Sequence, residues 1–410
     1  MRLGDVVRIN PESIPKAFRH SQIEYIDISS VGTGSLSRTT RYEAANAPAR
    51  ARRLVRDGDT ILATVRPNLR SFLYIKDPRP NLVVSTGFAV LRPRENIDPK
   101  FLYYTIAGQA FTDCLVSRVK GAAYPAVDVE TIADAEISLP PLPIQRRISQ
   151  ILSTYDDLIE NNLRRISILE EMAQAIYREW FVEFRYPGRG SEPLVESEAG
   201  LIPRNWEAGP IGSLVETMGG GTPSTSKLEY WENGSITWYT PSDLTASNAM
   251  FITSSSRKIT ELGLRSSSAK LFPPYSVMMT SRATIGVVSI ATTEACTNQG
   301  FITCIPNDRV SSYHLYFWLL DNRQMITSLA SGATFKEINK TVFRQLPIAV
   351  PPKGLAEAFM RVVSPVAGLV EVLLKQNVAL HHTRDLLLPR LISGELDVSD
   401  IAISTVEDNL

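Results

Sequence analysis

Residues 139–184 read LPPLPIQRRISQILSTYDDLIENNLRRISILEEMAQAIYREWFVEF, and this stretch decides the fold. Within it, hydrophobic residues recur at alternating intervals of four and three residues. The positions are Ile148, Leu152, Tyr155, Ile159, Asn162, Ile166, Leu169, Ala173, Ile176 and Trp180, here called the first seam, and nine of the ten are apolar. A 3.5-residue repeat is typical of a coiled coil. The sequence therefore predicts a helix from Pro143 to about Phe184, roughly 60 Å long at 1.5 Å per residue.

A second stripe of the same kind lies 211 residues further along the chain. Its positions are Phe359, Val363, Val366, Val370, Leu373, Asn377, Leu380, Arg384, Leu387 and Leu391, here called the second seam. Pro365 and Pro389 predict that this helix is shorter than the first or kinked at its ends. Asn162 and Asn377 each place an amide within a seam. Such an amide can fix the register of paired helices or face solvent at a frayed edge, and the sequence leaves both alternatives open.

The sequence before each helix is duplicated. Five matches keep the same order in both halves: DTILATVR (59–66) with SVMMTSR (276–282), which pairs Arg66 with Arg282; Gly87-Phe88 with Gly300-Phe301; Leu102-Tyr103 with Leu315-Tyr316; KGAAY (120–124) with SGATF (331–335); and Pro140-Pro141 with Pro351-Pro352. Ordered matches at a nearly constant offset of 211 to 216 residues indicate a tandem duplication.

Each half is predicted to be a mixed α/β domain followed by a long helix. Short runs rich in β-branched residues and bounded by Gly, Pro or Asn, such as ILATV, VVSTGFAVL, VMMT and GFITCI, predict strands. FLYYTIAGQAF and YHLYFWLLDN have the apolar spacing of helices. The predicted fold class is therefore α+β, with domains at 1–138 and 201–345 and helical segments at 139–200 and 346–410.

Composition excludes several protein classes. The chain has 410 residues, 44% of them hydrophobic, without an 18-residue apolar run that could span a bilayer. Its first residues, MRLGDVVRIN, lack the apolar core of a signal peptide. Cys114, Cys296 and Cys304 form neither an even set nor a CxxC pair, which disfavours a disulfide framework and a zinc site. We expect a reduced, cytoplasmic protein.

The net charge of zero is a cancellation between segments. Both predicted domains are basic: residues 1–138 carry 19 basic and 15 acidic residues, and residues 201–345 carry 12 basic and 10 acidic residues. Both helical segments are acidic: residues 139–200 carry 7 basic and 10 acidic residues, and residues 346–410 carry 5 basic and 8 acidic residues. Eight arginines lie between Arg38 and Arg70. Arginines in such a domain can contact phosphates and guanine. The alternative is a solvated surface whose arginines pair with nearby acids.

No catalytic or metal-binding motif stands out. The run GGGTPST (219–225) lacks the lysine of a phosphate-binding loop, so it predicts a flexible turn. In FPPY (272–275), Phe272 occupies the position where amino-methyltransferases acting on DNA carry Asp or Asn. His381 and His382 are adjacent, which is unsuitable for paired ligands on one helix face, and the remaining histidines are His20 and His314. Together with the duplicated basic domains and long helices, these features favour a recognition or adaptor protein over an enzyme.

The sequence resembles the specificity (S) subunits of type I restriction-modification systems, over essentially its whole length. Residues 139–184 are similar to the central conserved helix of that family, and LLLPRLISGELDVS (386–399) is similar to its distal conserved region. IPRNWEAGPIGSLVETMGGGTPSTSKLEYWENGSITWYTPSDL (202–244) resembles the entry to the second target-recognition domain, while LGDVVRIN and YIDISSV match the first domain more loosely. PPKGLAEAF (351–359) lacks the Glu-Gln pair usual there.

The resemblance implies two target-recognition domains separated by two long antiparallel coiled-coil helices, related by a pseudo-twofold internal repeat. Each domain would read one part of a bipartite double-stranded DNA site, and the helix length would set the unread spacer. The helices would also dock modification (methyltransferase) and restriction (translocase/nuclease) subunits. S-adenosylmethionine, ATP and Mg are expected on those partner subunits, with no cofactor, metal or catalytic residue in this chain.

Candidate DNA-binding residues flank the predicted core strands. They are Arg66, Asn68 and Arg70 in the first domain and Arg282, Asn298, Gln299 and Lys336 in the second. Arg suits guanine, and Asn and Gln suit adenine. The candidate helix-pair contacts are thirteen of the seam residues: Ile148, Leu152, Tyr155, Ile159, Asn162, Ile166, Leu169, Ile176, Val370, Leu373, Asn377, Leu380 and Leu387. A stand-alone DNA methyltransferase or nuclease, and a coiled-coil scaffold that does not bind DNA, are the alternative functions.

Overall fold

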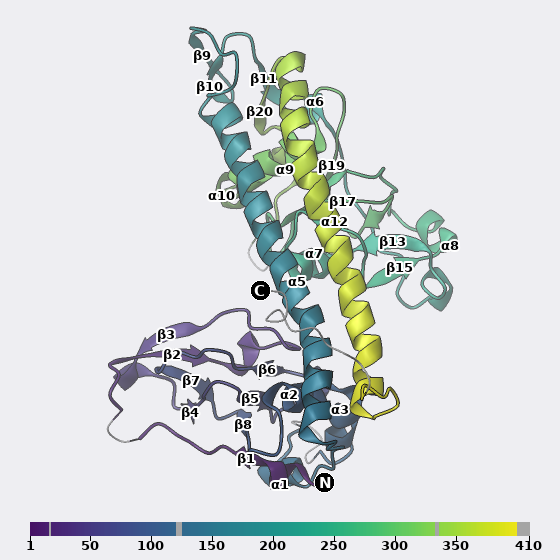
Figure 1. Ribbon diagram of the computed structural model, residues 1–410. Helices are drawn as coiled ribbons and strands as arrows, with labels where there is room; N and C mark the ends of the chain where they lie inside the picture. The colour runs from purple at the N-terminus through teal and green to yellow at the C-terminus, as the bar shows by residue number, and fades with distance from the viewer. Residues whose placement is uncertain (16–17, 120–124, 333–335, 400–410) are drawn as a thin grey trace. The chain divides into compact units, whose positions relative to one another are not determined.

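A computed structural model describes residues 1–15, 18–119, 125–332 and 336–399. The predicted match of KGAAY (120–124) with SGATF (331–335) therefore lies mostly outside the described residues. The chain divides into two compact units, unit 1 (Met1–Glu160 with Val378–Leu410) and unit 2 (Asn161–Asn377). Each unit includes part of both long helices, α5 (Leu142–Tyr177) and α12 (Lys353–Ile392) (Figure 1).

Unit 1 is a mixed α/β domain. Before α5 it contains α1 (Leu3–Val6), β1 (Val7–Ile9), β2 (Gln22–Ile26), η1 (Ile28–Ser30), β3 (Thr40–Glu43), η2 (Ala44–Asn46), β4 (Ala51–Leu54), β5 (Thr60–Ala63), η3 (Pro67–Leu69), β6 (Phe72–Tyr74), β7 (Leu82–Ser85), β8 (Phe88–Pro93), α2 (Pro99–Ala107), α3 (Gln109–Val116) and α4 (Val129–Ala133). The strands form two sheets, in the orders β1-β8-β5-β6 and β3-β2-β7-β4. Every residue of β5 is buried, and Asp98 caps α2 by accepting a hydrogen bond from Phe101 N.

Unit 2 is also mixed α/β. Between the long helices it contains η4 (Arg178–Val182), β9 (Leu194–Ser197), β10 (Gly200–Pro203), β11 (Glu207–Pro210), α6 (Ile211–Leu214), β12 (Glu216–Met218), η5 (Leu228–Tyr230), β13 (Ile236–Tyr239), α7 (Pro241–Ser247), β14 (Phe251–Ile252), β15 (Arg257–Ile259), α8 (Glu261–Arg265), β16 (Val277–Thr280), β17 (Val288–Ala291), β18 (Cys296–Thr297), β19 (Phe301–Ile305), α9 (Ser312–Asp321), α10 (Arg323–Ser328), α11 (Lys340–Arg344) and β20 (Pro347–Val350). The mixed helix and strand content predicted for both halves is confirmed.

The two units repeat the same strand order. In unit 2, β12-β19-β16-β17 follows the order of β1-β8-β5-β6, and β15-β13-β18 follows that of β3-β2-β7. The second sheet of each unit contains one parallel pair, β2 with β7 in unit 1 and β13 with β18 in unit 2. Unit 1 adds β4 at one sheet edge, and unit 2 adds β14 at another. The duplication read from the sequence is thus a duplication of topology.

Three backbone hydrogen bonds between loops recur in both units. They are Thr64 N to Gly87 O (2.8 Å), Val127 N to Thr64 O (2.9 Å) and Arg66 N to Pro125 O (2.8 Å) in unit 1, and Ser281 N to Gly300 O (2.7 Å), Ile338 N to Ser281 O (3.0 Å) and Ala283 N to Lys336 O (3.2 Å) in unit 2. Arg66 therefore corresponds to Ala283, and both have positive φ, 50° and 58°. The predicted match of Arg66 with Arg282 is wrong by one residue.

The long helices lie antiparallel within each unit. In unit 2, Asn162 Nδ2 donates a hydrogen bond to Asn377 Oδ1 over 2.9 Å, and the ring centroids of Trp180 and Phe359 are 6.0 Å apart. In unit 1, Arg384 Nη1 donates to Asp156 Oδ1 over 2.5 Å. Asn162 and Asn377 are buried and face each other, so neither amide lies at a frayed edge.

The seam residues are buried or half-buried in their units. Those that are buried are Ile148, Leu152, Ile159, Asn162, Ile166, Ala173, Trp180, Phe359, Val363, Val370, Leu373, Asn377 and Leu391, and those that are half-buried are Tyr155, Leu169, Ile176, Val366, Leu380, Arg384 and Leu387. Ile148 and Leu152 join the unit 1 core, and Ile166, Val370 and Leu373 join the unit 2 core. Among the described residues, no helix is both long enough and apolar enough to cross a membrane.

The second helix is longer than the first, not shorter. Helix α12 has 40 residues and runs through both Pro365 and Pro389, whereas α5 has 36. Pro365 and Arg361 are both exposed. Because the Arg361 carbonyl loses its intrahelical donor at Pro365, water can satisfy it at this surface position.

Candidate nucleic-acid interface

The loop between β5 and β6 carries the three candidate residues of unit 1. It contains the 3-10 turn η3, which is flanked by Arg66 and Arg70, both in the left-handed backbone region with φ of 50° and 54°. Leu69 N donates to Arg66 O over 2.9 Å, and Arg70 N donates to Pro67 O over 3.0 Å. The turn exposes Arg66 and Asn68 and leaves Arg70 half-buried.

Arg70 is directed into the protein. Its Nη2 donates to Ala107 O over 2.5 Å, at the C-terminal end of α2, and its Nη1 donates to Gln109 Oε1 over 3.0 Å. Its Nε is buried and has no partner among the described residues. These contacts assign Arg70 to holding the loop, whereas the exposed Arg66 and Asn68 side chains are the ones placed to meet a ligand.

The candidate residues of unit 2 lie on three neighbouring loops. Arg282 Nε lies 2.8 Å from Glu337 Oε1, in an ion pair whose side chains are both more than a third exposed. The adjacent Lys336 is exposed, and its carbonyl accepts the hydrogen bond from Ala283 N. Ser281 N donates to Gly300 O, which brings the third loop, with Asn298 and Gln299, to the same place. The structure thus gathers all four predicted residues around one set of strand ends.

Like Arg282, the Asn298 and Gln299 side chains are already engaged within unit 2. Asn298 Oδ1 accepts a hydrogen bond from Gly300 N over 2.8 Å, so it holds its own turn. Gln299 is exposed, and its Oε1 accepts from Thr222 Oγ1 over 2.6 Å. The Gln299 amide nitrogen is thereby oriented away from Thr222, and its donor capacity is compatible with contact to a base edge.

The glycine-rich segment 219–221 is part of this site, which the sequence did not predict. A Cβ on Gly220 would lie 1.9 Å from Thr297 O, and one on Gly221 would lie 2.6 Å from Ala269 N. The glycines therefore allow the segment to pack directly on neighbouring backbone. Thr222, which follows them, is the residue that sequence reasoning missed. The run of three glycines was its only signal.

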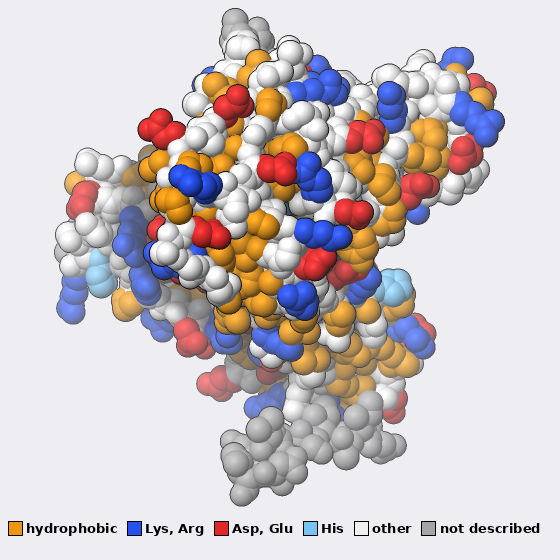
Figure 2. Space-filling view, turned by 90° about the horizontal axis from the view of Figure 1, so that it is seen from above, with side chains coloured by type: hydrophobic (Ala, Val, Ile, Leu, Met, Phe, Trp, Pro, Cys, Tyr) orange, Lys and Arg blue, Asp and Glu red, His pale blue; other side chains and the backbone are white. Residues whose placement is uncertain are grey.

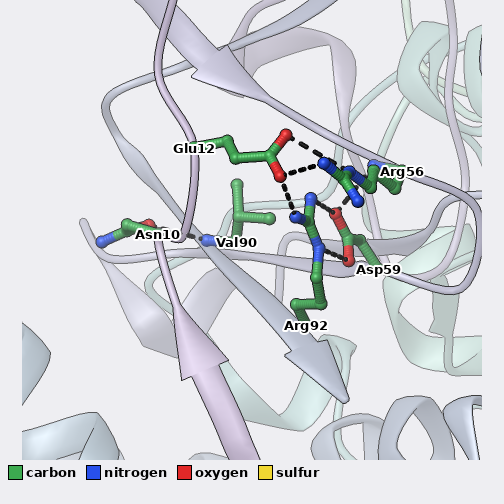
Figure 3. A network of polar contacts seen from close by, with 6 residues as sticks. All are labelled: Asn10, Glu12, Arg56, Asp59, Val90 and Arg92. Carbon is green, nitrogen blue, oxygen red and sulfur yellow. Dashed lines mark hydrogen bonds and ion pairs between the residues drawn. The ribbon is translucent and has the colours of Figure 1, made fainter. Parts of the chain in front are cut away.

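Many arginines of unit 1 pair within the domain. Arg92 donates from Nε and Nη2 to the fully buried Asp59 carboxylate over 2.9 and 2.8 Å, and from Nη1 to Glu12 over 2.7 Å (Figure 3). These bonds raise the pKa of Arg92 above its usual value. Glu12 also pairs with Arg56. This network joins strand β8 to the segment before β5 and is structural.

The arginine-rich segment 38–70 accordingly divides into two groups. Arg41 pairs with Glu24, and Arg53 donates to Asn10 and to Phe88 O, where burial lowers its pKa. Like Arg56 and Arg70, these two arginines have partners inside the domain, as the alternative interpretation of the arginine-rich segment predicted. Arg38 and Arg50 are exposed and can supply phosphate contacts.

Charge on the surface is mixed. Figure 2 shows one face, on which Lys and Arg side chains are interspersed with Asp, Glu and hydrophobic ones. Among the described residues, no group of His, Cys, Asp and Glu could hold a metal ion.

Comparison with known proteins identifies relatives for both halves. Residues 1–171 and 203–358 match the family described as Type I restriction modification DNA specificity domain. The type I restriction enzyme HindI specificity subunit of Haemophilus influenzae is 26% identical, over 96% of this chain and 98% of the relative. The type I restriction enzyme MjaIX specificity subunit of Methanocaldococcus jannaschii is 36% identical, over 48% of this chain and 45% of the relative.

A solved structure shares the fold. The crystal structure of a type I restriction-modification system S subunit from M. genitalium is 12% identical and aligns with a TM-score of 0.55, over 97% of this chain and 96% of that chain. Both the sequence match and this structural similarity extend over the two duplicated halves.

Proposed function

The chain belongs to the type I restriction-modification DNA specificity family, and we propose that it is the sequence-specific DNA-binding subunit of such a complex. One observation carries the proposal: the family match occurs twice, over two units that repeat the same loops at the same strand ends. Two copies of one recognition site suit a bipartite target, in which each copy reads one half.

In the proposed readout, some side chains contact the DNA and others hold the loops in position. Arg66 and Asn68 would meet the first half-site, and Arg282, Gln299 and Lys336 the second. On binding, Arg282 would exchange Glu337 for guanine or a phosphate, while Gln299 would pair with adenine. Arg70 and Asn298 act as positioning residues, since their polar atoms hold the loops on which the other side chains stand.

We further propose that residues 1–138 and 201–345 are target-recognition domains separated by an antiparallel coiled coil that sets the spacer. The buried seam residues of α5 and α12 support this arrangement. The helices also expose large apolar side chains: Leu158, Leu163, Ile168 and Met172 on α5, and Val362, Leu369, Val372, Val378 and Leu386 on α12. This surface suits docking of modification subunits, which would carry S-adenosylmethionine, with restriction subunits supplying ATP- and Mg-dependent steps.

Substitution of Arg282 tests the readout. Arg282→Ala should weaken binding of the assembled methyltransferase to its DNA target by about 1–3 kcal/mol, because one specific base or phosphate contact is lost. The second half-site alone should become tolerant of base changes. Binding is measured with duplexes altered in one half-site at a time, the target being taken from methylation-sensitive sequencing of the host genome.

Arg309→Ala is the matched control. Arg309 also lies in unit 2 and also forms an exposed ion pair, with Glu207, but it stands outside the candidate loops. The control should bind like wild type. Equal losses for the two variants, or wild-type binding without sequence preference, would exclude the proposed readout. Methyl transfer to DNA by the isolated chain with S-adenosylmethionine would instead favour a stand-alone methyltransferase.

A further inference from the structure

One large apolar side chain stands at the tip of the unit 1 loop. Leu69 is 59% exposed, and on the same turn Arg66 and Asn68 are exposed. We propose that Leu69 is a wedge that inserts between neighbouring base pairs of the first DNA half-site and unstacks them. The inference rests on the proposed function, to which it adds a residue that acts on DNA shape rather than on base edges.

The turn that carries Leu69 is braced at both ends. Pro67 is buried beneath it, and Arg66 N donates to Pro125 O over 2.8 Å. At the other end, the Arg70 guanidinium is tied to the C-terminus of α2, and Arg70 O accepts from Thr33 Oγ1 over 3.2 Å. Because these contacts fix the backbone on each side, Leu69 is held outward in the absence of DNA. A wedge requires this pre-organisation, since a loose leucine would fold back onto the protein.

Two segments of the chain that meet beside the Leu69 turn are basic in sequence. Segments 28–42 and 60–76, which lie against each other through the Gly34 N to Phe72 O hydrogen bond, contain no Asp or Glu. They contain five basic residues, of which Arg41 and Arg70 are engaged within the domain and Arg38, Arg66 and Lys76 are exposed. The stretch VGTGSLSR (31–38) is made largely of small polar residues and glycine, which allow a DNA backbone to approach closely. This charge pattern favours DNA over an apolar protein partner.

Among the residues that the structure describes, the corresponding loop of unit 2 carries no equivalent of Leu69. In the corresponding loop, the residue that matches Arg66 is Ala283, and the residues exposed after Arg282 are Ala283 and Thr284. The next apolar residue, Ile285, is 6% exposed and belongs to the core. The two recognition sites therefore share one framework but differ at the tip, and only the first half-site should be unstacked.

An apolar wedge has a defined effect on recognition. Side chains such as Leu that enter between base pairs kink the duplex, and the cost is lowest at flexible pyrimidine–purine steps. Leu69 should thus add a preference for a deformable step within or beside the first half-site, at a position where no polar side chain reads a base.

Fluorescence of 2-aminopurine tests the wedge in the complex of this chain with its modification subunit. The probe replaces a base in the first or the second half-site, away from the methylated adenines. We expect wild type to raise the fluorescence in the first half-site beyond that in the second. Leu69→Ala should remove this excess and weaken binding about tenfold, as expected for loss of a buried leucine side chain. Leu69→Met should keep both the excess fluorescence and the wild-type affinity.

Leu262→Ala is the matched control, because Leu262 is 50% exposed on α8 of unit 2 and lies outside the candidate loops. It should change neither signal. Unchanged fluorescence and affinity in Leu69→Ala, with sequence-specific binding intact, would overturn the wedge and leave the proposed function standing. Weaker assembly with the modification subunit in the absence of DNA would assign Leu69 to a protein contact instead. Absence of sequence-specific binding in wild type would overturn both.

Discussion

His314 is a buried titratable residue outside the candidate interface. It lies on α9 with its ring centroid 4.8 Å from that of Phe181 and 5.5 Å from that of Tyr177. Burial lowers its pKa to about 4, and its Nε2 has no partner among the described residues. The folded protein therefore holds this imidazole neutral at pH values where an unfolded histidine is protonated.

This difference predicts a pH-dependent stability of unit 2. Because the folded pKa is below the unfolded value of 6.5, the unfolded chain gains a proton first as the pH falls. Stability from His314 is complete above pH 6.5 and is lost towards pH 4, by about 1.4 kcal/mol per pH unit. Denaturant unfolding followed by tryptophan fluorescence measures it, since all five tryptophans lie in residues 161–377.

His314→Gln should flatten this dependence between pH 6.5 and 4. The exposed His20, replaced by Gln in the same way, is the control and should leave the profile of unit 2 unchanged. Parallel profiles for wild type and His314→Gln would contradict the assignment.

Single residues also show how much of the candidate site could be predicted from the sequence. Residue types and strand-end positions led to Arg66, Arg282 and Lys336 as predicted DNA contacts, and the structure exposes all three on the recurring loops. They were insufficient for Arg70, because the direction of its guanidinium depends on the α2 carbonyl that tertiary folding brings beside it. Leu69 was missed because an exposed leucine cannot be told from a core leucine without the fold.

At the scale of the helices, Asn162 and Asn377 form a polar pair in an otherwise apolar seam of unit 2. Both are buried, and Asn377 Nδ2 has no partner among the described residues. The pair is therefore a poor source of stability compared with two leucines. A buried polar pair of this kind is best known for favouring one register of paired helices.

A double-mutant cycle should reveal the pairing. Asn162→Leu or Asn377→Leu alone leaves one amide buried without its partner, at about 1–3 kcal/mol. The double variant removes both amides. Its loss in free energy of unfolding should therefore be smaller than the sum of the two single losses, by at least about 1 kcal/mol. Thermal unfolding provides the values, with Ile166→Leu as a seam control. Additive effects would show that the amides do not stabilise one another.

Element prediction from the sequence was strongest where one local pattern extends furthest. The first helix was expected from Pro143 to about Phe184, and α5 with η4 spans Leu142 to Val182. The length of the second helix was underestimated because proline removes one hydrogen bond from a helix and was expected to end or kink it. At its surface position, Pro365 tolerates the lost hydrogen bond. The close packing of segment 219–221 on neighbouring backbone was not predicted, because it leaves no mark in the sequence besides glycine itself.

At the scale of the whole molecule, the proposed spacing by the helices can be tested by lengthening them. Insertion of one heptad after Ile166, with a matching heptad in α12, adds about 10 Å to each helix. The unread spacer should lengthen by about three base pairs, and both half-sites should stay the same. Methylation-sensitive sequencing of cells that express the variant gives the new target. A changed half-site with an unchanged spacer would refute the idea.

The discontinuity of unit 1 has a consequence for synthesis on the ribosome. Unit 2 is one continuous segment, whereas the core of unit 1 includes Leu391 and Val398 near the end of the chain, and Arg147 Nη1 donates to Val398 O. The module made first is therefore completed last, after unit 2 has emerged and can fold. A nascent chain halted before residue 378 would carry one finished domain and one with exposed apolar core, which makes the unfinished first domain the natural target of chaperones and proteases.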